Sequence, residues 1–144
     1  MRSLLLSIIG GIAGGALAAP TCTMATDATL HFGAVNALAS TGDRTTNSGT
    51  SLWVNCTSEV TTSPALYSTT TRTLVSGGSS LAFTLSAIAA DGSELPMAFP
   101  GTSLGVARNG SNQTVTLYSK IRAADFKALP SGSYSRVVTL TLEY

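Results

Sequence analysis

The last twelve residues, Ser133 to Tyr144, constrain the fold most strongly. Read with a period of two, one face carries apolar side chains, namely Tyr134, Val138, Leu140, Leu142 and Tyr144. The opposite face is mostly Ser, Thr and Glu, and Arg136 and Val137 are the two exceptions. This alternation predicts a half-buried β-strand. We expect the far edge of this strand to lack a partner within the chain, and a strand from another chain to cover it.

Residues 1–18 have the pattern of a secretory signal peptide. Arg2 supplies the positive start, Leu4 to Ala13 the apolar core, and Ala16-Leu17-Ala18 the cleavage site. The alternative is a membrane anchor, but the apolar run is about 16 residues long and rich in Gly, whereas a bilayer span needs roughly 20. Secretion is therefore favoured, with no membrane span left after the signal is removed.

The remaining chain, residues 19–144, is long enough for one domain and too short for two. Without Arg2, seven Lys and Arg face seven Asp and Glu, so this part is formally neutral. A nucleic-acid partner is disfavoured because no basic patch is present to neutralise phosphates.

Cys22 and Cys56 are the two cysteines, and a single disulfide is the expected state in an oxidising compartment. The bridge closes a loop of roughly 35 residues, worth about 3–4 kcal/mol in the chain-entropy model. The alternative, a metal site, needs two further ligands, and His31 is the only histidine.

Short stretches with period-two alternation recur along the chain, separated by Gly, Asn, Asp and Pro turns. The expected strands are residues 21–24 and 29–32, interrupted around Asp27, followed by 51–56, 65–68, 81–86, 115–121 and 133–144. Gly33 to Gly49 is expected to be a surface loop, and Ala123 to Leu129 one helical turn. Such a series predicts an all-β sandwich, with a closed barrel as the alternative.

Enzymatic activity and a cofactor are not expected. The chain has no Ser-x-x-Lys and no Gly-rich phosphate loop. His31 lies on an expected strand without an accompanying acid or nucleophile, so it reads as a packing or surface residue. Asp91 and Glu94 flank a turn and read as a solvated loop, and Trp53 as core or groove packing.

The segment Leu95 to Leu104 is the strongest candidate for an exposed apolar loop. It carries Met97 and Phe99 between two prolines, Pro96 and Pro100. We expect it to form a contact surface.

In their order and spacing, several of these motifs resemble the spore coat protein U domain family, which includes subunits of archaic chaperone–usher pili. The resemblance is carried by Cys22, Leu30-His31-Phe32-Gly33, Cys56, Arg72-Thr73-Leu74, Leu81 to Leu85, Val115 to Ile121, and Gly132 to Tyr144. Arg136 departs from the pattern, because the family commonly has an acidic residue there.

The resemblance implies an incomplete immunoglobulin-like sandwich that lacks its last strand, with a disulfide and a groove. In such proteins a periplasmic chaperone first lends a strand to the groove. The N-terminal extension of a neighbouring subunit later replaces that strand at an outer-membrane usher. The groove residues implied here are Leu30, Phe32, Val138, Leu140, Leu142 and Tyr144.

The predicted function is a secreted structural or adhesive pilus subunit, which passes through the periplasm to the cell surface. If cleavage follows Ala18, Ala19 to Thr21 precede Cys22 and span at most about 10 Å. That length is too short to fill a neighbour's groove, so we expect a terminal or minor subunit. The alternative is a self-complete spore-coat-like or extracellular matrix protein.

Overall fold

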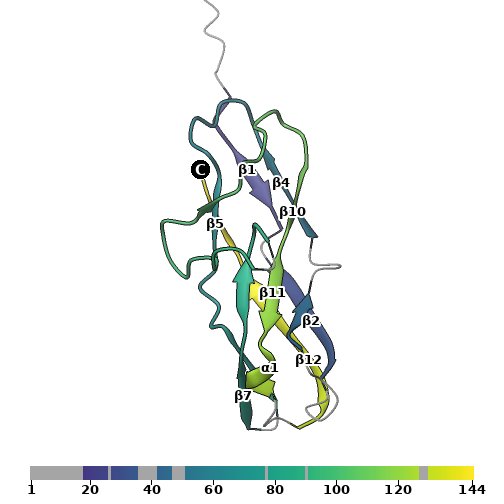
Figure 1. Ribbon diagram of the computed structural model, residues 1–144. Coiled ribbons are helices and arrows are strands. Elements are labelled where there is room, and N and C mark those ends of the chain that lie inside the picture. Colours follow the sequence, from purple (N-terminus) through teal and green to yellow (C-terminus); the bar gives the residue numbers. More distant parts are fainter. Residues whose placement is uncertain are drawn as a thin grey trace, which may run out of the picture.

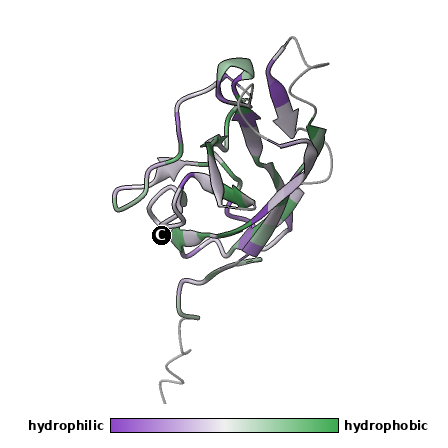
Figure 2. Cartoon of the chain, turned by 90° about the horizontal axis from the view of Figure 1, so that it is seen from below, coloured by the Kyte–Doolittle hydropathy of each residue, from purple (hydrophilic) through white to green (hydrophobic). Residues whose placement is uncertain are grey.

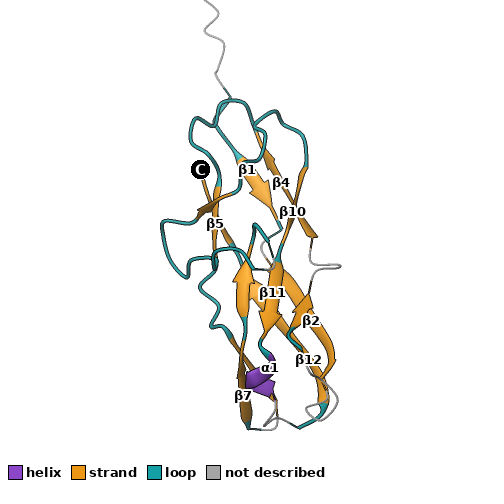
Figure 3. Cartoon of the chain, viewed as in Figure 1, coloured by secondary structure: helices purple, strands orange, loops and turns teal. Residues whose placement is uncertain are grey.

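The computed structural model describes residues 18–25, 27–35, 42–46, 51–76, 78–89, 91–126 and 130–144. Apart from Ala18, the predicted signal peptide lies outside these residues, as do residues 36–41 and 47–49 of the predicted loop and the end of the predicted helical turn. The loop prediction is wrong for residues 33–35 and 44–46, which are strand. Strands dominate the described residues, which confirms the all-β prediction (Figure 3). No helix in these ranges has the length and apolar character needed to cross a bilayer.

One layer contains two three-stranded sheets, ordered β1–β4–β10 and β3–β11–β8. The strands of this layer are β1 (Cys22–Met24), β3 (Arg44–Thr46), β4 (Ser51–Cys56), β8 (Thr84–Ser86), β10 (Gln113–Thr116) and β11 (Tyr118–Ile121). In the chain β3 leads into β4, and β10 leads into β11, so the two sheets can be read as one. The combined order is then β1, β3 with β4, β10 with β11, and β8. Strands A, B, E and D of an immunoglobulin constant-type domain have this order.

The second layer is built around the C-terminal strand, with sheet orders β12–β2 and β13–β5–β9. Its strands are β2 (Asp27–Val35), β5 (Ala65–Tyr67), β9 (Thr102–Ser103), β12 (Gly132–Thr139) and β13 (Thr141–Glu143). A hairpin of β6 (Thr73–Ser76) and β7 (Ser79–Ala82), and the helical turn α1 (Ala123–Phe126), complete the described elements at the lower end of the molecule (Figure 1).

The two layers enclose the side chains that the period-two alternation turns inward. In β4, Leu52, Val54 and Cys56 are buried, and in the C-terminal strand Tyr134, Val138 and Leu140 are buried. Seen along the long axis, the strands surround a common interior (Figure 2). Phe32 and Phe83 meet there with ring centroids 5.9 Å apart.

The structure corrects one sequence-based prediction and supports another. Trp53 is not a packing residue, because it occupies an outward position of β4 and is 44% exposed. Met97 and Phe99 lie in an exposed loop, as predicted, with Phe99 75% exposed. A strand at positions 97–99 is absent from this described loop.

Arg72 fastens the connection between β5 and β6 to the segment that follows β8. Its guanidinium donates to the carbonyl oxygens of Thr70 at 2.7 Å and Leu95 at 3.1 Å. The side chain is 10% exposed, and Nε lies 3.6 Å from the half-exposed carboxylate of Glu94. Burial lowers the pKa of Arg72, and the charge of Glu94 opposes this effect. The carbonyl bonds, which are short and buried, contribute more than the ion pair.

Replacing Arg72 with Ala should therefore lower the free energy of unfolding by about 2–4 kcal/mol, because two buried carbonyls lose a charged donor. Glu94→Gln, the matched control, should cost about 1 kcal/mol or less, since half-exposed ion pairs are weak. Chemical denaturation of both variants measures the difference. Equal losses would show that the ion pair, and not the carbonyl bonding, is what stabilises this connection.

Candidate functional site: a groove between β1 and β13

The C-terminal strand has one edge directed toward the segment that contains β5. On that side β13 pairs with β5, Thr139 N–H donates to Thr70 Oγ1 at 2.9 Å, and Arg136 donates to Thr71 Oγ1 at 3.4 Å. The opposite edge therefore faces the N-terminal strands. In a complete immunoglobulin-like domain this is where a further strand, G, pairs with F.

Along the lower half of this opposite edge, a segment of the same chain is present. β2 pairs antiparallel with β12, from Gly132 opposite Val35 to Thr139 opposite Asp27. The register shifts between Tyr134 and Ser135, near Gly33, whose φ of 68° is accessible to glycine without strain. The expectation of an unpaired far edge is thus wrong for residues 132–139.

The upper half of the same edge is open. β1 turns away from β2 and pairs with β4, Cys22 opposite Cys56, while β13 pairs with β5, Leu142 opposite Leu66. Within the described chain, no strand pairs with the two edges that β1 and β13 turn toward each other. A groove of about 330 Å³ lies between them, lined by Cys22, Thr23, Met24, Leu140, Thr141, Leu142 and Tyr144.

The groove has an apolar floor and polar backbone walls. Leu140 is buried at 3% exposure, and Met24 and Leu142 are half-buried against the core. The free N–H and C=O groups of two strand edges, above alternating apolar side chains, are what an added β-strand recognises. The arrangement suits binding of an extended polypeptide.

Three of the six predicted groove residues, Leu140, Leu142 and Tyr144, line this groove. The other three, Leu30, Phe32 and Val138, are buried in the core where β2 covers the lower half. Thr23 and Met24 were missed as lining residues. One hint in the sequence that they line the groove is their position just before the break at Asp27. A first strand that is broken there leaves part of the edge of the C-terminal strand unpaired.

A comparison with protein-family models matches the Spore Coat Protein U domain over residues 12–141. The chain belongs to the Spore Coat Protein U domain family. This confirms the resemblance, and the family is structural and adhesive rather than enzymatic. Neither curated proteins nor solved structures gave a match.

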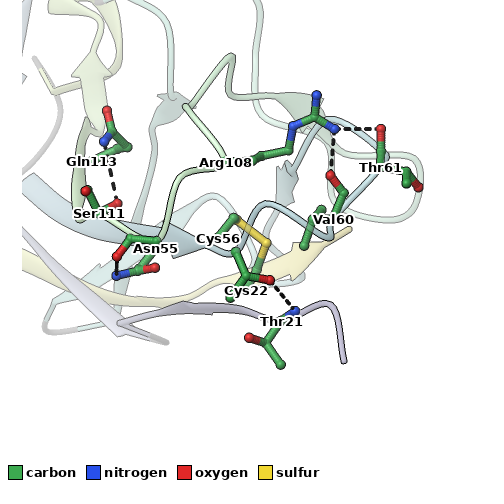
Figure 4. Close-up of a disulfide and its surroundings, with 11 residues drawn as sticks. Thr21, Cys22, Asn55, Cys56, Val60, Thr61, Arg108, Ser111 and Gln113 are labelled. Carbon is green, nitrogen blue, oxygen red and sulfur yellow. Dashed lines mark hydrogen bonds between the residues drawn. A yellow bond between two sulfur atoms is a disulfide. The ribbon is translucent and has the colours of Figure 1, made fainter. Parts of the chain in front are cut away.

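In this Spore Coat Protein U domain the predicted disulfide is present and fixes one wall of the groove. Cys22 and Cys56 are directly opposite residues of β1 and β4 and are bonded (Figure 4). Beside them, Thr57 N–H donates to Thr21 O at 2.9 Å, and Thr21 N–H donates to Thr57 Oγ1 at 3.2 Å. The start of β1 is thus fastened to β4 both covalently and by hydrogen bonds.

Asp91 and Glu94, which the sequence placed in a solvated loop, have separate partners. Asp91 binds the ammonium of Lys120, and Glu94 pairs with Arg72. The hydrogen bond that Lys120 donates to Asp91 is the main reason why the pKa of Lys120 is raised. Among the described residues, no group of three or more His, Cys, Asp and Glu is placed to hold a metal ion.

The double variant Cys22→Ser/Cys56→Ser should lower the free energy of unfolding by about 3 kcal/mol, because the bridge spans 34 residues and restricts the unfolded chain. Urea denaturation measures this value. Wild-type protein kept reduced throughout is the control and should match the variant. A loss well below about 1 kcal/mol in both samples would show that the hydrogen bonds alone hold β1 to β4.

Proposed function

We propose that this domain is a secreted structural or adhesive subunit of a chaperone–usher-type pilus, and that the groove between β1 and β13 accepts a strand from another polypeptide. One observation carries the proposal: two strand edges face each other across an apolar floor with no strand between them. Membership of the Spore Coat Protein U domain family supports it.

The inserted strand gains main-chain hydrogen bonds from both walls, and its alternate side chains enter the floor formed by Leu140 and Leu142. Neighbouring strands are about 4.8 Å apart, so a strand paired with both walls needs them about 10 Å apart. In the unoccupied domain β1 and β13 approach within 8 Å between Cα atoms. The two walls must therefore move apart to admit the strand. A short donor needs only the upper half of the edge. A longer donor must also displace β2 from β12. This breaks the β-ladder that runs from the pair Asp27 and Thr139 to the pair Val35 and Gly132.

The proposed partners are a periplasmic chaperone, an outer-membrane usher and neighbouring subunits. The predicted signal peptide directs the chain to the periplasm, where the chaperone supplies the first strand. The usher then exchanges that strand for one from a neighbour, at the cell surface. Each step involves the same edge of β13, so chaperone and neighbour compete for one groove.

A terminal or minor position in the fibre is the finer part of the proposal. Thr21 is hydrogen-bonded to Thr57 and therefore belongs to the folded domain. If cleavage follows Ala18, only Ala19 and Pro20 precede it, which is too short for a donor strand. Intact-mass measurement of the secreted protein tests this, and a mature N-terminus ten or more residues longer would exclude it.

The second candidate is a self-complete coat or matrix protein. The observation that favours it is the β2–β12 ladder, which already closes the lower half of the edge with the chain's own residues. In that case the upper groove is a surface depression, and the domain needs no partner to be stable.

Periplasmic expression of the chain with and without a co-expressed periplasmic chaperone of the chaperone–usher type separates the two candidates. A strand acceptor should be poorly soluble alone and recovered as a stoichiometric complex with the chaperone, because binding stabilises the folded state. Size-exclusion chromatography with light scattering measures both states. A stable monomer that ignores the chaperone would favour the self-complete protein.

Leu142→Glu should weaken chaperone binding by at least about tenfold, because a carboxylate on the groove floor is desolvated when a strand is inserted. Val137→Glu is the matched control, since Val137 is 56% exposed on the outer side of β12. Co-purification yields of the two variants, with circular dichroism of each, provide the measurement. Equal chaperone binding by both variants would place the donor strand elsewhere.

A further inference from the structure

A second open pocket lies on the other side of Tyr144 from the groove. Its volume is about 310 Å³, and its lining includes Phe99, Pro100, Tyr144, Glu143, Thr62 and Ser63. Phe99 and Glu143 do not line the groove. The pocket is therefore a separate site, and an inference about it goes beyond the proposed function.

The loop that exposes Phe99 is held in place at both ends. Ser68 N–H donates to Pro96 O at 3.0 Å, and Leu104 N–H donates to Pro64 O at 2.9 Å. Between these bonds Gly101 lies so close to the neighbouring strand that a Cβ there would come within 2.7 Å of Leu66 O. The loop is fixed, yet its largest side chain is 75% exposed. A fixed loop therefore presents an exposed aromatic side chain to this pocket.

The charge in this pocket is negative. Glu143 is the charged lining residue, and its carboxylate accepts a weak hydrogen bond from Gly101 N–H at 3.4 Å. No Lys, Arg or His is among the described residues that line the pocket. The guanidinium of Arg108 donates to Val60 O at 2.8 Å and to Thr61 O at 2.6 Å, so it is bound to the backbone at residues 60–61 (Figure 4).

A second carboxylate stands in the adjoining depression of about 210 Å³, which shares Thr62 and Tyr144 with the first and contains Glu59. The pKa of Glu59 is lowered by a hydrogen bond from its own backbone, and further by Thr57 and Ser58. Tyr144 thus lines two depressions, one together with Glu143 and the other together with Glu59. An anionic ligand is repelled here, and a neutral ligand gains only the apolar contact.

We propose that the pocket formed by Phe99, Tyr144 and Glu143 binds an organic ammonium group carried on an apolar stem. Aromatic faces attract cations through their negative quadrupole, and quaternary ammonium groups are bound in this way between aromatic rings. Glu143 supplies the full negative charge, and Pro100 contacts the stem. The site is open to solvent. It can therefore bind the ammonium group of a free small molecule or one at the end of a larger molecule.

Choline chloride is the probe, and dimethylbutanol, its neutral carbon isostere, is the control at constant ionic strength. The titration follows backbone amide shifts of the soluble protein, in complex with its chaperone where solubility requires it. Choline should bind saturably, with shifts at Phe99, Gly101 and Tyr144. The isostere should bind at least about fivefold more weakly, because it lacks the charge. Equal binding of the two probes, or equal binding of methyl glucoside, would overturn the proposal.

Phe99→Ala and Glu143→Gln should each weaken choline binding by about fivefold or more. Met97→Ala is the matched control, because Met97 belongs to the same loop and is half-exposed but does not line the pocket. Phe99→Ala should retain the melting temperature and chaperone binding of the wild type. Failure of choline binding with chaperone binding intact would remove this proposal alone. Wild-type choline affinity in both pocket variants would also overturn it.

Discussion

The structure depends on how the edges of the C-terminal strand are satisfied. Each residue of a strand carries an N–H and a C=O that must be paired with protein or water. On one edge, β5 and the side chains of Thr70 and Thr71 provide partners. On the other edge, β2 provides them for residues 132–139 only. The unfilled remainder faces β1 and forms the groove.

Both walls of this groove are held by other strands of the sandwich. The disulfide and the paired backbones of Thr21 and Thr57 hold β1 to β4, and β13 is paired with β5. Each wall is thus a strand edge held by its own sheet. The strand proposed to dock there would pair with these edges after the two walls move apart, because β1 and β13 approach within 8 Å between Cα atoms.

Two surfaces meet at Tyr144, with different chemistry. On one side lies the groove, whose recognition groups are backbone amides above an apolar floor. On the other lies the pocket of Phe99 and Glu143, whose recognition groups are an aromatic face and a carboxylate. The two sites share Tyr144 but differ in their other groups, so the proposed strand and the proposed cationic ligand are recognised by different chemistry.

The sequence by itself determined which side chains are buried, because a period of two assigns faces directly. Leu52, Val54, Val138 and Leu140 were placed correctly in this way, and two cysteines leave only one possible pairing. The break in the first strand near Asp27 was also visible. Trp53 was misread because an isolated aromatic residue was weighed by its size rather than by its outward position in the alternation.

Only the tertiary structure decided which strand lies beside which. Backbone donors and acceptors are the same in nearly every residue, so the sequence of a strand carries little information about its neighbour. The structure pairs β2 with β12 and β1 with β4, and because of this divergence only Leu140, Leu142 and Tyr144 of the six predicted groove residues line the groove. The burial pattern was local, whereas the vacancy arises from how all the strands are assembled.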